Sequence, residues 1–411
     1  MNTSRPRAFI YVGGSYPQIV GIQAVRDAGL YTILTDISAN APGQAYADRF
    51  EVISATNVQS LLALAHDVSE SFDIVGCYGV ADYAFDAIGA IYEAQGIPPD
   101  VRCDGNRLAQ AFRNASNKRT SKNLWRSAGL PVPRLVWASS AGATAIAEQV
   151  CRLLAPPVVV KPATSNSSKG VTLVLQKNST ELQAALDRAG QQGASVMIEE
   201  YIAGRLFNVD GLMINGVAQP VSITERGSCE GNSCQPRFGI QPADLEPNEA
   251  AALHDLAGRA ATVLGLNFGP FTVDVILAND GPRLLELSPH FHSIRSEFVR
   301  ANGGAMEAWL AFLMGNPLRS DHGQPPASPL VAYLQLYGGR AGTVQRVEGM
   351  EEIHTNTHVI DTYLLKEVGS VIHETDGYRD VCGVVWLKSD SRARLNSAIE
   401  QISQSLVFRT G

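Results

Sequence analysis

The chain has 411 residues, and at about 100–200 residues per domain this length predicts two to four domains. Hydrophobic residues make up 45% of the chain and charged residues 18%, a composition that excludes a largely disordered protein. The formal net charge of −7 disfavours nonspecific binding to nucleic acids or to membrane surfaces. We therefore expect neither a nucleic acid nor a membrane among the partners, although a local cationic pocket for phosphates remains compatible with this charge.

Hydropathy and cysteine spacing predict a cytoplasmic protein. The first apolar run, Ala8–Val12, is too short for the core of a signal peptide, and no stretch of about 18 apolar residues follows it. The six cysteines are scattered, and only Cys229 and Cys234 lie close together. A disulfide or a metal pair stays open there, but free thiols in a reducing compartment fit the spacing better.

Residues 1–105 alternate strand and helix patterns. The expected strands are Ala8–Val12, Tyr31–Leu34 and Asp73–Cys77, and the expected helices are Val20–Ala28 and Val58–Val68. This alternation predicts an open parallel sheet covered by helices. Gly13 and Gly14 follow the first strand, but GGSYPQ is not GxGxxG. They indicate either a phosphate-binding turn or a tight turn beside a substrate.

The rest of the chain has a different pattern. Residues 106–325 contain strand-like runs that end in charged residues, with helices expected at Ser179–Ala189 and Asn248–Leu264. Residues 317–328 are rich in proline, glycine and polar residues, which is typical of a linker. Residues 326–411 read as three strands and a final helix, which predicts a small α+β domain.

A segment with two lysines follows the strand expected at residues 158–163. Lys161 stands at the end of this strand, and residues 164–170 are small and polar apart from Lys169. Small residues let backbone N–H groups approach an anion, and a fixed ammonium balances phosphate charge. The segment lacks the GxxxxGK[ST] pattern of a Walker A motif. It therefore indicates either a phosphate-binding loop or an ordinary serine-rich hairpin.

Two carboxylates interrupt the apolar strands expected at residues 271–277 and 283–288. Asp274 and Glu286 lie at similar distances from the Asn-Asp-Gly turn at Asn279–Gly281, so the hairpin places them opposite each other. Two neighbouring carboxylates repel unless a cation lies between them. Mg²⁺ accepts one or two carboxylates together with substrate phosphates, which predicts a metal site; an ion pair of one acid with an arginine is the alternative.

The strand expected at residues 195–200 ends in Glu199 and Glu200 and leads through Ile202 to Gly204. At such a strand end, backbone N–H and C=O groups can face the planar base of a nucleotide, although an ordinary strand end has the same sequence pattern. The chemistry-bearing residues follow one another in the order Lys118, Lys161, Lys169, Glu199, Asp274 and Glu286. In this order and spacing the chain resembles the ATP-grasp superfamily over most of its length, in the branch of carboxylate–amine ligases of the L-amino-acid ligase type.

The resemblance implies a mixed α/β and α+β fold. It implies an N-terminal open parallel sheet, the pre-ATP-grasp domain, at residues 1–105. A central two-lobed ATP-grasp domain is expected at residues 106–325, and a small C-terminal α+β domain of the ligase type at residues 326–411.

The resemblance also implies ATP and Mg²⁺ as cofactors, with Mn²⁺ as the alternative metal. The residues expected at ATP are Lys118, Lys161, Ser167, Ser168, Lys169, Gly170, Glu199, Glu200 and Ile202. Among these, Glu199 is expected to face the exocyclic amine of adenine, and Glu200 and Ile202 the base through their backbone. The expected metal ligands are Asp274, Glu286 and Ser288, and the expected catalytic residues are Arg226, His290 and Arg295.

The second metal strand departs from the family pattern. Where the family usually has Glu-x-Asn-Pro-Arg, the chain has Glu286-Leu-Ser288-Pro-His290. Serine is a weaker metal ligand than asparagine, and histidine cannot bind two oxygens as the fork of an arginine does. The candidates for the missing guanidinium are Arg226, Arg237 and Arg295. His290 and His292 indicate either a contact with substrate or phosphate or a transition-metal site.

The implied reaction has two steps, in which a substrate carboxylate and ATP give an acyl phosphate that an amine then attacks. The expected partners are small-molecule carboxylates and amines, amino acids among them, and a homodimer is common in related ligases. Three alternatives stay open: an ATP-grasp kinase, an ATP-grasp carboxylase, and a nucleotide-binding protein without catalysis, since Ser288 and His290 are weaker than the usual pair.

Overall fold

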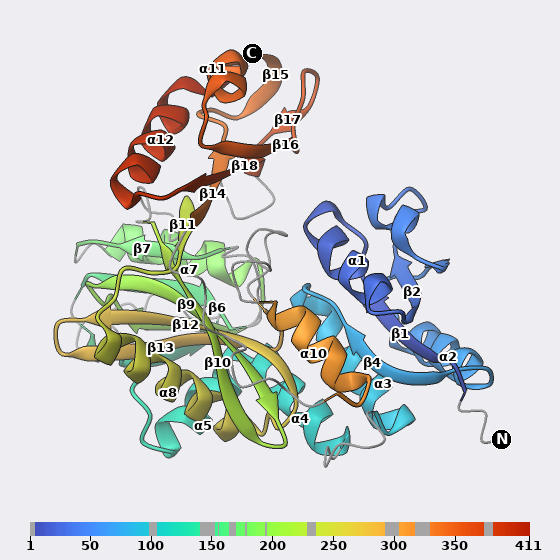
Figure 1. Ribbon diagram of the computed structural model, residues 1–411. Helices are drawn as coiled ribbons and strands as arrows, with labels where there is room; N and C mark the ends of the chain where they lie inside the picture. Colours follow the sequence, from blue (N-terminus) through green and yellow to red (C-terminus); the bar gives the residue numbers. More distant parts are fainter. Residues whose placement is uncertain are drawn as a thin grey trace.

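The computed structural model describes residues 5–97, 105–139, 153–154, 156–163, 170–176, 179–193, 195–227, 236–291, 304–316, 329–373 and 381–411. An N-terminal domain, drawn in blue, lies beside a central part, and the C-terminal part, in orange and red, stands against one end of the central sheet (Figure 1). The mixed α/β and α+β architecture predicted from the sequence is confirmed. In the described part of the chain, no helix has the length and apolar character needed to cross a membrane.

The N-terminal domain is an open parallel sheet, as predicted. Its strands are β1 (Arg7–Val12), β2 (Tyr31–Asp36), β3 (Arg49–Val52) and β4 (Asp73–Tyr78), and its helices are η1 (Tyr16–Gln18), α1 (Ile19–Asp27), η2 (Pro42–Tyr46), α2 (Val58–Ser69), η3 (Asp82–Ala84) and α3 (Phe85–Gln95). The strands pair in parallel in the order β3-β2-β1-β4. After β1, Gly13 has a φ of +96°, and the Gly14 N–H donates to Asp36 Oδ2 at 2.7 Å. The two glycines therefore form a tight turn at the carboxyl end of the sheet.

The smaller lobe of the central part is an antiparallel sheet with one helix. Its elements are β5 (Leu135–Ser139), β6 (Val158–Pro162), β7 (Thr172–Val174), α7 (Ser179–Gly190) and β8 (Ser195–Glu200). The strand order is β5-β8-β6-β7, so β8 lies between β5 and the strand that carries Lys161. Valine side chains of β6 and β8 pack with Leu182 and Leu186 of α7.

A second, larger sheet runs from the central part into the C-terminal part. In order, its strands are β13 (Gly281–Ser288), β12 (Gly269–Ala278), β9 (Arg205–Ile214), β10 (Val217–Arg226), β11 (Phe238–Gln241), β14 (Leu330–Tyr337), β18 (Val381–Ser389) and β16 (Val359–Leu364). The junction is the antiparallel pair β11–β14, in which Gly239 lies opposite Tyr333. The sequence did not predict this continuity, and the domain boundaries at residues 105/106 and 325/326 stay predictions.

The remaining elements pack around this sheet, pack against the N-terminal domain, or form a separate three-stranded sheet. They are α4 (Gly105–Ser116), α5 (Lys118–Ser127), α8 (Pro247–Leu264), α10 (Ala305–Leu313), β15 (Gly342–Glu348), α11 (Met350–Thr355), β17 (Val371–Ile372), α12 (Arg392–Ser405) and β19 (Val407–Thr410). Phe207 and Val209 of β9 join the hydrophobic core with Leu253 and Leu256 of α8. Because side chains alternate along a strand, Asn208 of β9 faces the other side of the sheet.

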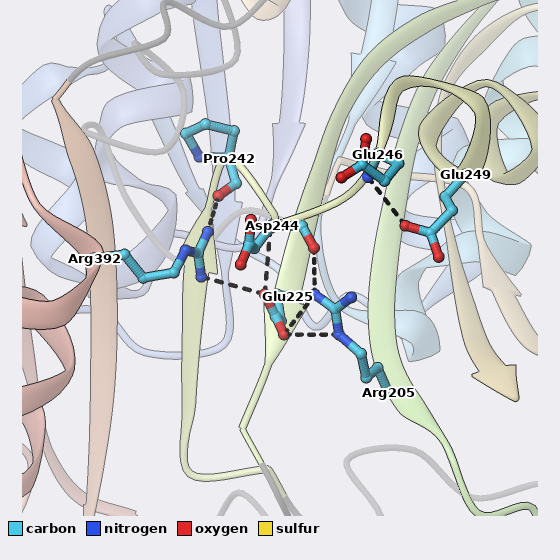
Figure 2. A network of polar contacts seen from close by, with 7 residues as sticks. All are labelled: Arg205, Glu225, Pro242, Asp244, Glu246, Glu249 and Arg392. Atoms are coloured by element: carbon cyan, nitrogen blue, oxygen red, sulfur yellow. Dashed lines mark hydrogen bonds and ion pairs between the residues drawn. The ribbon is translucent and has the colours of Figure 1, made fainter. Parts of the chain in front are cut away.

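A polar network ties α12 to the central strands (Figure 2). Glu225 of β10 accepts hydrogen bonds from Arg205 of β9 at 3.0 and 3.1 Å and from Arg392 of α12 at 3.2 Å. Arg392 also donates to the Pro242 carbonyl, and Arg205 to the Asp244 carbonyl. The C-terminal part is therefore held to the central sheet by side chains as well as by the β11–β14 pair.

Candidate active site

The two strands of the β12–β13 hairpin place Asp274 and Glu286 opposite each other, as predicted. Asn279 and Asp280 lead into Gly281, whose φ of +116° suits the turn. Glu286 Oε1 lies 2.6 Å from Lys118 Nζ at the start of α5. About a third of each carboxylate side chain remains exposed, so the pair lines an accessible surface of the sheet.

Side chains of β9 and β10 also contact Asp274. The Asn208 side-chain amide donates to Asp274 Oδ1, and its oxygen accepts from Arg226 Nη1 at 2.8 Å. Arg226 Nη1 itself lies 4.0 Å from Asp274 Oδ2. Partial burial raises the pKa of Asp274 to about 6, against the opposing effect of Arg226 and with reinforcement from Glu286.

Two buried polar atoms on this face lack a partner within the described part of the chain. Arg226 Nε has no hydrogen-bond acceptor there, and Thr272 Oγ1 has no hydrogen-bond partner. Thr272 lies opposite Ser288, two positions along the strands from Asp274 and Glu286. Because buried polar groups are nearly always hydrogen-bonded, these atoms suit a face that receives a polar ligand.

Glu199 lies between two lysines. Its Oε1 lies 2.8 Å from Lys122 Nζ and its Oε2 2.6 Å from Lys161 Nζ, and only 3% of its side chain is exposed. Burial alone would raise the pKa of Glu199, but the two ammonium groups hold this pKa below its ordinary value, so the carboxylate is ionised. The predicted contact with adenine stays a prediction; a carboxylate has about four acceptor positions, which leaves capacity for it.

Helix α5 supplies lysines to both lobes. The side chain of Asn117 caps the helix by accepting from the N–H groups of Arg119 and Thr120. Lys118 contacts Glu286, and Lys122, one turn later, contacts Glu199 and donates to the Leu284 carbonyl at 2.8 Å. Lys122 was not predicted from the sequence, although its spacing of four residues from Lys118 places both on one helix face.

The segment after β8 leaves the smaller lobe toward β12. Glu200 accepts from the Arg134 N–H at 2.8 Å, and its own N–H donates to the Arg134 carbonyl. A Cβ on Gly204 would lie 2.5 Å from the Leu277 carbonyl oxygen, so this glycine permits a close backbone approach. Ile202 lies between them and is partly exposed. These residues thus connect the smaller sheet to the larger one. Their contact with the adenine base stays a prediction.

Other predicted site residues are only partly placed. Gly170 has a φ of +73°. The His290 ring lies 5.7 Å from the Phe85 ring of the N-terminal domain, and its Nδ1 lies 2.6 Å from the Phe291 carbonyl oxygen. Ser167, Ser168, Lys169, Arg295, His292, Cys229 and Cys234 lie outside the described residues. Within the described ranges, no three acidic, histidine or cysteine residues group as a metal centre, so the candidate metal site rests on Asp274 and Glu286.

A groove of about 740 Å³ lies away from this cluster of lysines and carboxylates. It runs between α8 and the Ala218–Pro220 end of β10, and Phe271 is part of its wall. None of the predicted site residues lines this groove. The candidate active site is therefore the region where Lys118 of α5 and Lys161 of β6 lie near Asp274 and Glu286 of the larger sheet.

Comparison with known proteins gives the family. Residues 124–291 match the family described as D-ala D-ala ligase C-terminus, and residues 335–411 match L-amino acid ligase C-terminal domain 2. The chain is 31% identical over 240 residues to D-alanine–D-alanine ligase B of Chromobacterium violaceum, which covers 56% of this chain and 72% of that protein. The chain belongs to the D-Ala–D-Ala ligase and L-amino acid ligase branch of the ATP-grasp superfamily.

Two further likenesses extend over nearly all of this ATP-grasp chain. Protein y4rH of Sinorhizobium fredii is 23% identical over 406 residues, which cover 94% of this chain and 79% of that protein. The crystal structure of the L-amino acid ligase from Bacillus licheniformis superposes over 100% of both chains with a TM-score of 0.76 and 17% identity. Protein y4rH is a relative by sequence, whereas the L-amino acid ligase structure shows that the fold is shared. The family matches and the D-alanine–D-alanine ligase relative make the protein an ATP-dependent carboxylate–amine ligase that forms a carbon–nitrogen bond.

Proposed function

We propose that the protein joins the carboxylate of one amino acid to the amine of a second through an acyl phosphate, with Mg²⁺ as its metal. The convergence of Lys118 and Arg226 on the Asp274–Glu286 pair, with the charge of Lys161 also acting on Asp274, supports this proposal most directly. The names of the matched families, D-ala D-ala ligase and L-amino acid ligase, support amino acids as the substrate class. A homodimer stays a prediction.

The residues fit a polyphosphate and a divalent cation. Asp274 and Glu286 offer hard oxygen ligands on adjacent strands, with Ser288 next on the same face, which is the ligand type that Mg²⁺ prefers. Bound there, the metal would neutralise charge on the transferring phosphoryl group. Lys118 and Lys161 would hold phosphate oxygens. The Nε of Arg226, which has no acceptor among the described residues, offers a further donor to developing negative charge.

In the proposed reaction, an oxygen of the substrate carboxylate attacks the γ-phosphorus of ATP, the bond to the bridging oxygen breaks, and ADP leaves. The amine nitrogen then attacks the acyl carbon, the bond from carbon to the phosphate oxygen breaks, phosphate leaves and the nitrogen loses a proton. The chain's residues orient the reactants and balance charge, so no side-chain nucleophile is needed. Residues 164–170 are proposed to cover the phosphates and exclude water, because an acyl phosphate hydrolyses readily.

An ADP-release screen over pairs of amino acids, with mass detection of products, tests the proposal. We expect ADP release to require both an acid and an amine, and one product to be the two substrates joined with loss of water. A phosphorylated acid that accumulates whether or not an amine is present would instead indicate a kinase. Absence of turnover together with an ATP-dependent rise in melting temperature would indicate a nucleotide-binding protein.

The raised pKa of Asp274 predicts pH-dependent metal binding. Below a pH of about 6, this carboxyl binds a proton that competes with the metal, so the dissociation constant should rise about tenfold for each further pH unit. Titration of Mn²⁺ in the presence of ADP, followed by electron paramagnetic resonance, measures this constant. A protein-free titration corrects for protonation of the nucleotide. Asp274→Asn should bind the metal weakly with no such dependence, and an equal dependence in both proteins would contradict the prediction.

A further inference from the structure

A buried amide lies between the candidate metal site and Arg226. Asn208 of β9 is opposite Asp274 of β12 on one side and opposite Thr224 of β10 on the other. Residues that lie opposite each other share a face of the sheet, and Arg226 reaches the same face from two positions beyond Thr224. Only 1% of Asn208 is exposed. A buried amide of this kind needs partners both for its nitrogen and for its oxygen.

The two ends of the Asn208 amide meet groups of opposite charge. Its NH₂ group donates to Asp274 Oδ1, and its oxygen accepts from Arg226 Nη1 at 2.8 Å. If the amide were turned over, its oxygen would face the carboxylate and its NH₂ group the guanidinium, and both contacts would be repulsive. The neighbours therefore fix the orientation of the amide. Arg226 Nη1 stays 4.0 Å from Asp274 Oδ2, which is longer than a hydrogen bond.

The amide thus separates two charges that attract each other. In a direct ion pair, the guanidinium would lie on the carboxylate that is proposed to bind a metal, and this positive charge would oppose the binding of a second cation there. Because the amide is neutral, it satisfies both groups without adding charge to the site. An acid at this position would repel Asp274, and a base would repel Arg226.

We propose that Asn208 is a positioning residue whose amide orients the Asp274 carboxylate for the metal and keeps the Arg226 guanidinium from closing onto it. This inference rests on the proposed function, in which Asp274 binds Mg²⁺ and Arg226 faces developing negative charge. Asn208 acts through these two side chains and not on the reactants. Groups that hold a metal ligand in place contribute to metal affinity although they do not touch the metal.

The first test is the affinity of Asn208→Val for Mn²⁺ in the presence of ADP, followed by electron paramagnetic resonance against a protein-free titration. Valine suits a buried strand position and can neither donate to Asp274 nor accept from Arg226. We expect the dissociation constant for Mn²⁺ to rise about ten- to a hundredfold, the range for residues that orient metal ligands. Melting curves show whether the variant is folded.

The decisive comparison is with Asn208→Thr. Threonine has nearly the shape of valine, but its hydroxyl can donate to the carboxylate and accept from the guanidinium. We expect Asn208→Thr to bind Mn²⁺ about threefold or more tightly than Asn208→Val, the smaller end of what one hydrogen bond contributes. A packing defect would weaken both variants equally, because the two side chains fill the same space.

Thr224→Val is the control on the same face of the sheet. The exchange removes the buried hydrogen bond from Thr224 to Gln241 Oε1 at 3.2 Å and leaves the Asn208 amide in place. It introduces the same apolar group one strand away from Asn208, so it reports what the loss of a buried hydrogen bond does on its own. We expect the affinity of Thr224→Val for Mn²⁺ to equal that of the wild type.

Two results would overturn the inference: wild-type affinity for Mn²⁺ in a folded Asn208→Val, or Asn208→Thr that binds Mn²⁺ as weakly as Asn208→Val. If Asn208→Val does not fold, Asn208→Ala and Asn208→Ser provide the same comparison with smaller side chains, and the same difference is expected. A wild-type protein that binds no Mn²⁺ beyond the protein-free titration contradicts the proposed function itself. A wild type that binds Mn²⁺, with either of the two overturning results, leaves the function standing and removes only the role of Asn208.

Discussion

Glu286→Gln is expected to reduce ADP release by more than about 100-fold, because an amide cannot supply the charge that a carboxylate offers to a divalent metal. Glu286 lies opposite Asp274 and 2.6 Å from Lys118, at the point where metal and phosphates are proposed to meet. The side chain of its partner Lys118 is only 9% exposed, but the oxygen of a glutamine can still accept a hydrogen bond from this ammonium group. The melting temperature should therefore stay within a few degrees of the wild type.

Asp280→Asn is the matched control for this variant. Asp280 belongs to the turn of the same hairpin, where its exposed carboxylate pairs with Arg283 at 2.6 Å. Both substitutions replace a carboxylate with an amide. We expect ADP release by Asp280→Asn to be close to that of the wild type. Steady-state ADP release and melting curves measure both variants. Wild-type turnover in Glu286→Gln, or an equal loss in both variants, would show that Glu286 has no special role.

Lys161→Met is expected to have an effect of similar size on ADP release and to weaken MgATP binding. The variant loses the cation proposed to balance phosphate charge, and fixed charges at a transferring phosphoryl group contribute strongly to its stabilisation. The fold should survive, because Glu199 keeps Lys122 as a buried partner at 2.8 Å. The structure thus predicts that a buried lysine can be removed here without leaving the carboxylate unpaired.

Calorimetric titration with MgATP, circular dichroism and ADP release together separate binding from folding in Lys161→Met. Lys388→Met, at an exposed position near the end of β18, is the control, since it removes a lysine from a strand of the other sheet. We expect the control to bind MgATP normally. Unchanged MgATP affinity in Lys161→Met would remove Lys161 from the nucleotide site.

Local patterns predicted much of the fold and part of the site. The alternating strands and helices of residues 1–105 predicted the parallel sheet, because each pattern reports which side of a short element is buried. The Asn-Asp-Gly turn predicted the hairpin and so made Asp274 and Glu286 cross-strand neighbours. A register shift between Asp274 and Val275 then sets Glu286 directly opposite Asp274.

What the sequence did not reveal depends on contacts between distant segments. The sequence does mark Asn208, because Asn208 and Asp210 alternate with apolar residues of β9. Its contact with Asp274, however, follows only from the pairing of β9 with β12. Lys122 repeats the helix position of Lys118, yet only the packing of α5 against both sheets shows that its partner is Glu199. Such pairings join residues dozens of positions apart, which local periodicity does not encode.

The β11–β14 junction limits how this enzyme can be engineered by exchanging segments with relatives. A C-terminal segment taken from a relative would have to restore the pairing of Phe238–Gln241 with β14, in the register that sets Gly239 opposite Tyr333. The ring of Tyr333 lies where a Cβ on Gly239 would be, so a bulkier residue in the first strand excludes the aromatic residue in the second. A truncation before β14 would leave β11 as an unpaired edge, which invites association with other chains. Exchange of substrate preference between relatives is therefore better attempted by substitutions within the joined sheet than by transplanting its end.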